Sequence, residues 1–161
     1  MKRTLLLVAV LVCMVFVYSQ QAAAQQYAIG GRGGLSIFSS GGSSAGLQIG
    51  PTFDVNIGKS LFAGSDLNIN TQGGTPVEWA YYIKYMIDAS RPDILPYVNG
   101  GFSLWFVTGG PYFALRVGGG AYFPISKNIS IPADVQLGPV FTSGSSTFYF
   151  ALTSGIRYTL P

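Results

Sequence analysis

The chain has 161 residues, of which 48% are hydrophobic and only 9% are charged, whereas charged residues make up about 25% of an ordinary soluble domain. A soluble domain of this size would need more charge on its surface, and an aromatic fraction of 14% argues equally against a disordered chain. The nine basic and six acidic residues form no basic cluster, so a nucleic-acid partner is not expected.

The first residues predict a secretory signal peptide. Lys2 and Arg3 are followed by an apolar run over residues 4–18 and by three alanines at residues 22–24. The run is shorter than the roughly 20 residues that a spanning helix needs, and the whole pattern is that of a cleaved export signal. We place cleavage after Ala24, which gives a signal peptide over residues 1–24 and one domain over residues 25–161. Cys13 is removed with the signal, so the mature chain has no disulfide or thiol site.

Eight segments of the mature chain alternate between apolar and polar residues, as strands with two different faces do. Short runs rich in Gly, Ser and Pro join them and are typical of turns. The segments are residues 27–38, 46–57, 61–70, 77–88, 95–107, 112–123, 129–141 and 147–160. This pattern predicts an all-β domain. Glycine-rich runs at residues 30–34 and 118–120 lie within strands and indicate a tightly curved sheet. No helix follows either run, so a phosphate-binding loop is not expected.

Segment 77–88 has the clearest alternation. One set of alternate positions reads Val, Trp, Tyr, Ile, Tyr, Ile, while the other set holds Glu78, Lys84 and Asp88. The segment is rich in aromatic residues and bounded by Gly-Gly-Thr-Pro and Arg-Pro, which favours a strand over a helix. One of its faces is therefore apolar and the other is charged.

The charges of the mature chain avoid every apolar face. Seven basic and six acidic residues remain after the signal is removed, and four of them, Lys59, Arg91, Asp93 and Lys127, fall in turns. The other nine lie on the polar face of a strand: Arg32, Asp54, Asp66, Glu78, Lys84, Asp88, Arg116, Asp134 and Arg157. This face is nevertheless poor in Lys and Glu for a surface that meets water.

The apolar faces carry many large aromatic residues. They include Trp79, Tyr81, Tyr85, Phe102, Phe106, Phe113, Phe148, Phe150 and Tyr158. An eight-stranded barrel has an interior just wide enough for side chains, and the small polar residues suit it better than these rings. We therefore predict a barrel with the aromatics toward lipid and the nine charged residues as a polar network in the lumen. Closure of the sheet would leave no unpaired edge in the bilayer.

The end of the chain carries a further signature. Thr153, Gly155, Tyr158 and Leu160 match the polar, glycine, aromatic and apolar positions of the C-terminal assembly signal of outer-membrane barrels. Residues 91–101 and 123–128 are also typical of these proteins. The mature chain thus resembles the small eight-stranded outer-membrane barrels of the OmpX and OmpA type, that is, the outer membrane protein β-barrel domain families.

The resemblance implies an eight-stranded antiparallel up-and-down transmembrane β-barrel with short turns in the bacterial outer membrane. Its implied partners are outer-membrane lipid and, during biogenesis, periplasmic chaperones and the barrel-assembly machinery. We expect a monomer. If the N-terminus lies in the periplasm, as the family implies, the loops near residues 39–45, 71–76, 108–111 and 142–146 face outside. They carry no charge, so clamping of lipopolysaccharide phosphates is not expected.

The site chemistry points away from catalysis. The chain has no histidine, which excludes His-dependent hydrolases and transferases. Because Cys13 is removed with the signal, the mature chain also lacks the usual ligands of zinc and copper. Four strand carboxylates could pair as acid and base, but the four basic residues on the same faces favour an ion-pair network. We expect no enzyme, no metal and no cofactor.

Three functions remain open. The first is a non-enzymatic barrel with a structural or envelope role and a lumen filled by side chains. The second is a narrow pore for ions or small solutes, which needs water along the lumen. The third is a soluble periplasmic carrier barrel of the lipocalin type, which predicts a mature chain that stays soluble without detergent.

Overall fold

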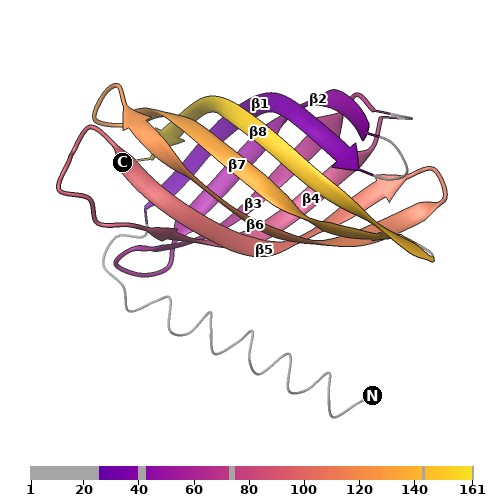
Figure 1. The fold of residues 1–161 in the computed structure, drawn as a ribbon. Coiled ribbons are helices and arrows are strands. Elements are labelled where there is room, and N and C mark those ends of the chain that lie inside the picture. Colours follow the sequence, from indigo (N-terminus) through magenta and orange to yellow (C-terminus); the bar gives the residue numbers. More distant parts are fainter. Residues whose placement is uncertain (1–25, 40–42, 73–74, 143, 161) are drawn as a thin grey trace, which may run out of the picture.

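Eight antiparallel strands close into a barrel in the computed structural model, which describes residues 26–39, 43–72, 75–142 and 144–160 (Figure 1). Each strand pairs with its neighbours in the chain, and β8 pairs back with β1. The strands are β1 (Tyr27–Ser39), β2 (Ser43–Asn56), β3 (Leu61–Asn70), β4 (Val77–Met86), β5 (Leu95–Val107), β6 (Gly110–Pro124), β7 (Ile129–Thr142) and β8 (Ser145–Thr159). The predicted fold class is confirmed, and the strand ends differ from the predicted ones by three residues at most.

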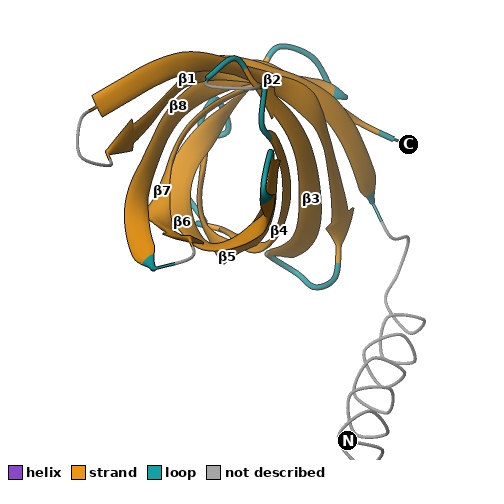
Figure 2. Cartoon of the chain, turned by 90° about the vertical axis from the view of Figure 1, so that its right-hand side faces the viewer, coloured by secondary structure: helices purple, strands orange, loops and turns teal. Residues whose placement is uncertain are grey.

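The sheet encloses an interior on all sides, as the view along the barrel shows (Figure 2). Closure gives every strand a hydrogen-bonded neighbour on both sides and leaves no open sheet edge, which a bilayer demands. Within the described residues, no helix is long and apolar enough to cross a membrane. The predicted signal peptide lies outside the described residues.

Three prolines interrupt the pairing between strands locally. Proline has no backbone N–H and cannot donate to a neighbouring strand. The residue-by-residue register is broken beside Pro51 on the side of β3, beside Pro132 on the side of β8, and beside Pro139 on the side of β6. In each case the opposite side of the strand stays paired, so the barrel remains closed.

Alternation along each strand sorts the side chains between the interior and the outer wall. In β4, Glu78, Tyr82 and Lys84 are buried, whereas Trp79 and Ile83 are exposed. The exposed large apolar side chains occupy the outer face of all eight strands. Soluble monomers rarely expose continuous apolar surface of this extent, so the outer wall is suited to lipid.

Close packing between β4 and β5 depends on Gly101. This residue faces the interior, and a Cβ atom built on it would collide with the backbone of Tyr81 and Tyr82 in β4. Its neighbour Gly100 faces the outer wall, where the nearest atom to such a Cβ, the carbonyl oxygen of Arg116, lies 3.8 Å away. That distance is an ordinary van der Waals contact, so only one of the two adjacent glycines is required by the packing.

We predict that Gly101→Ala lowers the free energy of unfolding by about 1–3 kcal/mol, the usual cost of overpacking. Gly100→Ala should change it by less than about 0.5 kcal/mol, as surface substitutions do. Urea unfolding of the refolded protein in lipid vesicles, followed by tryptophan fluorescence, measures both values. Equal effects of the two substitutions would contradict this account of the strand packing.

Candidate functional site

The barrel interior is a charge-balanced polar core. Four basic and four acidic side chains of the described residues lie inside it, from every strand except β5: Arg32, Lys84, Arg116, Arg157, Asp54, Asp66, Glu78 and Asp134. All are buried except Arg157, which is half-buried. A net charge held away from water would be costly, so the equal numbers are what a tightly packed interior requires.

Asp54 of β2 connects the groups in the interior near the chain termini. Nζ of Lys84 donates to its two carboxylate oxygens at 3.0 and 2.9 Å, and Nε of Arg157 lies 3.4 Å from Oδ2. The hydroxyl of Tyr122 lies 2.5 Å from Nζ of Lys84 and donates to Asp54 at 3.3 Å. One carboxylate thus joins groups from β4, β6 and β8 across the barrel.

The middle of the interior contains two arginines and three carboxylates. Arg32 of β1 forms ion pairs with Asp66 of β3 and, at 3.4 Å, with Asp134 of β7. Arg116 of β6 lies 3.1 Å from Glu78 of β4 and 3.8 Å from Asp66. Each carboxylate in the interior therefore has a basic group within 4 Å.

The two groups of charges are linked by a tyrosine. The hydroxyl of Tyr82 lies 3.0 Å from a carboxylate oxygen of Asp54 and 3.0 Å from one of Asp66. The cavity among these side chains offers only about 20 Å³ to water, and one water molecule needs at least about 10–15 Å³ on this measure. The cavity beside Asp54, Lys84 and Arg157 therefore has room for about one water.

An aromatic cluster lies above the charges, toward the end of the barrel opposite the termini. The rings of Phe38, Trp105 and Tyr149 contact one another with centroids 4.9–5.2 Å apart. The hydroxyl of Tyr149 donates to Oε1 of Gln48 at 2.7 Å. Beyond the cluster the barrel opens into a cavity of about 330 Å³, which we call the mouth cup. Its lining comprises Phe38, Ser44, Gln72, Pro76, Trp105, Val107, Tyr112, Val140, Thr142 and Thr147.

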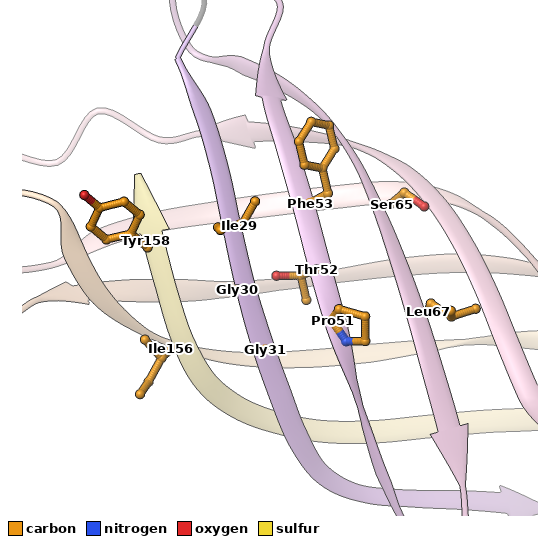
Figure 3. A pocket seen from close by; sticks show the side chains of 10 residues that line it. All are labelled: Ile29, Gly30, Gly31, Pro51, Thr52, Phe53, Ser65, Leu67, Ile156 and Tyr158. Carbon is orange, nitrogen blue, oxygen red and sulfur yellow. The ribbon is translucent and has the colours of Figure 1, made fainter. Parts of the chain in front are cut away.

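A separate hollow lies on the outer wall, where β1, β2, β3 and β8 are adjacent (Figure 3). Gly31 and Pro51 provide its shallow floor, and Phe53, Leu67 and Tyr158 flank it. Its lining holds no charged side chain. The hollow therefore has the character of the apolar outer wall.

The structure corrects one predicted lumen residue. Asp88 lies beyond the end of β4 at Met86, and its side chain is exposed. Its placement in the lumen is wrong because the strand ends before the alternation reaches it. The other eight predicted residues lie inside the barrel, and removing Asp88 from the set makes their charges balance.

The predicted lipid-facing aromatics lie on the outer wall. Eight of the nine are exposed, and Tyr81 is half-buried between the rings of Trp79 and Phe102, at centroid distances of 5.2 and 5.4 Å. In the C-terminal segment, Thr153 is buried, Gly155 is half-buried, and Tyr158 and Leu160 are exposed.

The predicted lumen network consists of charged residues only, whereas aromatic rings on the same faces also fill the interior. The rings are those of Tyr82, Tyr97, Trp105, Tyr122 and Tyr149, all buried. Tyr82, Tyr122 and Tyr149 share the parity of the charged residues in their own strands. In β5, which has no charged residue, Tyr97 and Trp105 share the parity of Asn99 and Ser103. Room for them comes partly from glycine, since a Cβ on Gly64 would collide with the ring of Tyr82.

A metal site would need at least three His, Cys, Asp or Glu side chains close together. The part of the chain that the structure describes contains no such group. The interior carboxylates contact basic groups, tyrosine hydroxyls and amides instead. The arrangement is suited to holding strands together.

Comparison with known proteins identifies the fold. No family model and no curated protein matches the chain, whereas solved structures do. Neisserial surface protein A has a TM-score of 0.71 at 17% identity, covering 86% of this chain and 100% of its own. The N-terminal β-barrel domain of Pseudomonas aeruginosa OprF has a TM-score of 0.62 at 10% identity, covering 83% of this chain and 97% of its own. The outer membrane protein OprG of the same organism has a TM-score of 0.56 at 12% identity, covering 88% of this chain and 98% of its own. With its apolar outer wall and closed eight-stranded sheet, the chain has the fold of the small outer-membrane β-barrel proteins.

Proposed function

We propose that the protein is a non-conducting, non-enzymatic barrel of the bacterial outer membrane with a structural role in the envelope. The main support is the packed interior, where the cavity beside five of the eight charged groups, Arg32, Asp54, Lys84, Asp134 and Arg157, has space for about one water. An ion entering this region would have to separate ion pairs that are held at 2.9–3.8 Å. The aromatic cluster of Phe38, Trp105 and Tyr149 adds a second obstruction toward the opposite end.

The state of the carboxylates supports a structural role over a catalytic one. A general acid or base must reach a substrate, but Asp54, Asp66, Glu78 and Asp134 are all buried and paired with basic groups. The interior thus offers no acid–base pair that a substrate can approach.

The apolar outer wall argues against the soluble carrier barrel. Such a protein would turn its apolar faces inward around a ligand and present charge to water. Here Leu47, Ile49, Val117 and Ile156 are more than half exposed, while the charged residues of the strands point inward. We infer that the wall meets outer-membrane lipid, that chaperones and the barrel-assembly machinery insert the chain, and that it functions as a monomer.

The first test of the proposed function is electrical. We predict that the refolded mature protein, reconstituted in planar bilayers, gives no ohmic current steps, because water does not fill the interior. The narrow-pore alternative predicts steps of uniform size that scale with salt concentration. Uniform steps would overturn the non-conducting assignment, while a quiet bilayer with correctly folded protein would support it.

The second test concerns the ion pairs. We predict that Asp54→Asn lowers the free energy of unfolding by about 3–5 kcal/mol, because it leaves Lys84 and Arg157 without the carboxylate that compensates them. The matched control is Asp88→Asn, the same change at an exposed position, which should stay within about 0.5 kcal/mol.

Urea unfolding in vesicles measures both variants of this pair. A cost at Asp54 no larger than that at Asp88 would mean that the interior carboxylate is not needed to balance its basic neighbours. The structural role of the interior charges would then have to be abandoned.

A further inference from the structure

The mouth cup differs in chemistry from the rest of the barrel interior. It opens at the end of the barrel that carries the turns between β1 and β2, β3 and β4, β5 and β6, and β7 and β8. Rings of Phe38, Trp105 and Tyr112 and the side chains of Val107 and Val140 make most of its surface apolar. None of the lining residues that the structure describes is charged. It is therefore an aromatic pocket at the end of a polar core.

The base of the mouth cup is closed. Trp105 packs edge-on against both Phe38 and Tyr149, with centroids 4.9 and 5.1 Å away. Trp105, Tyr149 and Val140 are 1–3% exposed and form one apolar cluster with Ala114 and Ala151. A molecule in the cup would therefore be held there and would not pass on to the charged groups.

Two residues that line the cup have polar atoms that form no hydrogen bond with the described part of the chain. The indole N–H of Trp105 and Oε1 of Gln72 are buried, and neither has a hydrogen-bond partner among the described residues. The amide nitrogen of Gln72 is already engaged, since it donates to the carbonyl oxygens of Ser36 and Ser44 at 2.7 and 3.1 Å. Buried polar atoms without partners are uncommon in proteins and call for a specific explanation. The other such side-chain atoms of the described residues belong to residues that do not line the cup.

We propose that the mouth cup binds a small neutral aromatic molecule with one N–H or O–H group, that is, a molecule of the indole or phenol class. A volume of about 330 Å³ lies at the small end of ligand pockets, which span about 300–1,000 Å³. Aromatic rings stack favourably on the walls. A charged ligand would lose its hydration without gaining a counter-charge. The proposal concerns capture at the mouth and holds whether or not the barrel conducts.

The test uses the refolded mature protein in lipid nanodiscs and 5-fluoroindole as the probe, followed by ¹⁹F NMR. Empty nanodiscs of the same lipid report partition into the membrane. We expect a saturable component that only the protein-containing discs show, and that unlabelled indole displaces. The anionic probe 4-fluorobenzoate should show no such component. No saturable binding beyond that of empty discs, or equal binding of the anion, would overturn the proposal.

Two adjacent positions of β8 provide matched variants. Thr147 lines the cup and Phe148 faces the outer wall, so Thr147→Trp fills the cup while Phe148→Trp places the same ring outside. We expect binding at least about tenfold weaker for Thr147→Trp, a loss of about 1.4 kcal/mol, and unchanged binding for Phe148→Trp. Val107→Trp fills the cup from β5 and replaces Thr147→Trp if that variant does not refold, as judged by heat-modifiable gel mobility. Wild-type binding by a folded cup-filling variant would show that the probe binds elsewhere.

Discussion

The balanced set of ion pairs inside the barrel is the interaction on which the rest of the structure depends. A charge facing lipid near the bilayer centre costs roughly 2–4 kcal/mol, so strand charges must point inward, where each needs a partner. Asp54 of β2 contacts Lys84 of β4 and Arg157 of β8, and Arg32 of β1 contacts Asp66 of β3 and Asp134 of β7. A slip of one residue in any strand except β5, which has no charged residue, would turn a charge outward. The pairs therefore fix the register, even where desolvation offsets much of their attraction.

The outer wall and the mouth follow from the same constraint. With the charges inside, alternation places residues such as Ile83 and Tyr85 on the outer wall, and lipid is the solvent that accepts them. The ion pairs fill the part of the barrel nearer the termini and its middle, leaving an uncharged region at the opposite end. There Trp105 and Tyr149 pack into an apolar cluster, and the cup above them provides the concave, uncharged surface that distinguishes this barrel's mouth from its core.

Most of the fold was predictable because successive side chains of a strand point to opposite faces. Alternation of apolar and polar residues in the sequence therefore shows directly which residues share a face. Glu78 and Lys84 were placed inward correctly for that reason, while Asp88 failed because the alternation continues past Met86, where the strand ends. The partners of each charge were not predictable. Which residues meet across a barrel depends on strand tilt and stagger, so the meeting of Asp54 with Arg157, 103 positions apart, has no local signal. The packing of the inward tyrosines was not predictable either, because it depends on space that residues of the next strand, such as Gly64, leave free.

The orientation of the two faces can be measured directly because the chain has two tryptophans, one on each side of the wall. Trp79 on the outer wall is 43% exposed, and Trp105 inside is 2% exposed. Single-tryptophan variants, made by Trp105→Phe and Trp79→Phe, can be refolded into vesicles that contain lipids brominated on their acyl chains. Bromine quenches fluorescence on contact, so we predict strong quenching of Trp79 and little of Trp105. Equal quenching of the two, or stronger quenching of Trp105, would contradict a barrel with a polar core and a lipid-facing apolar wall.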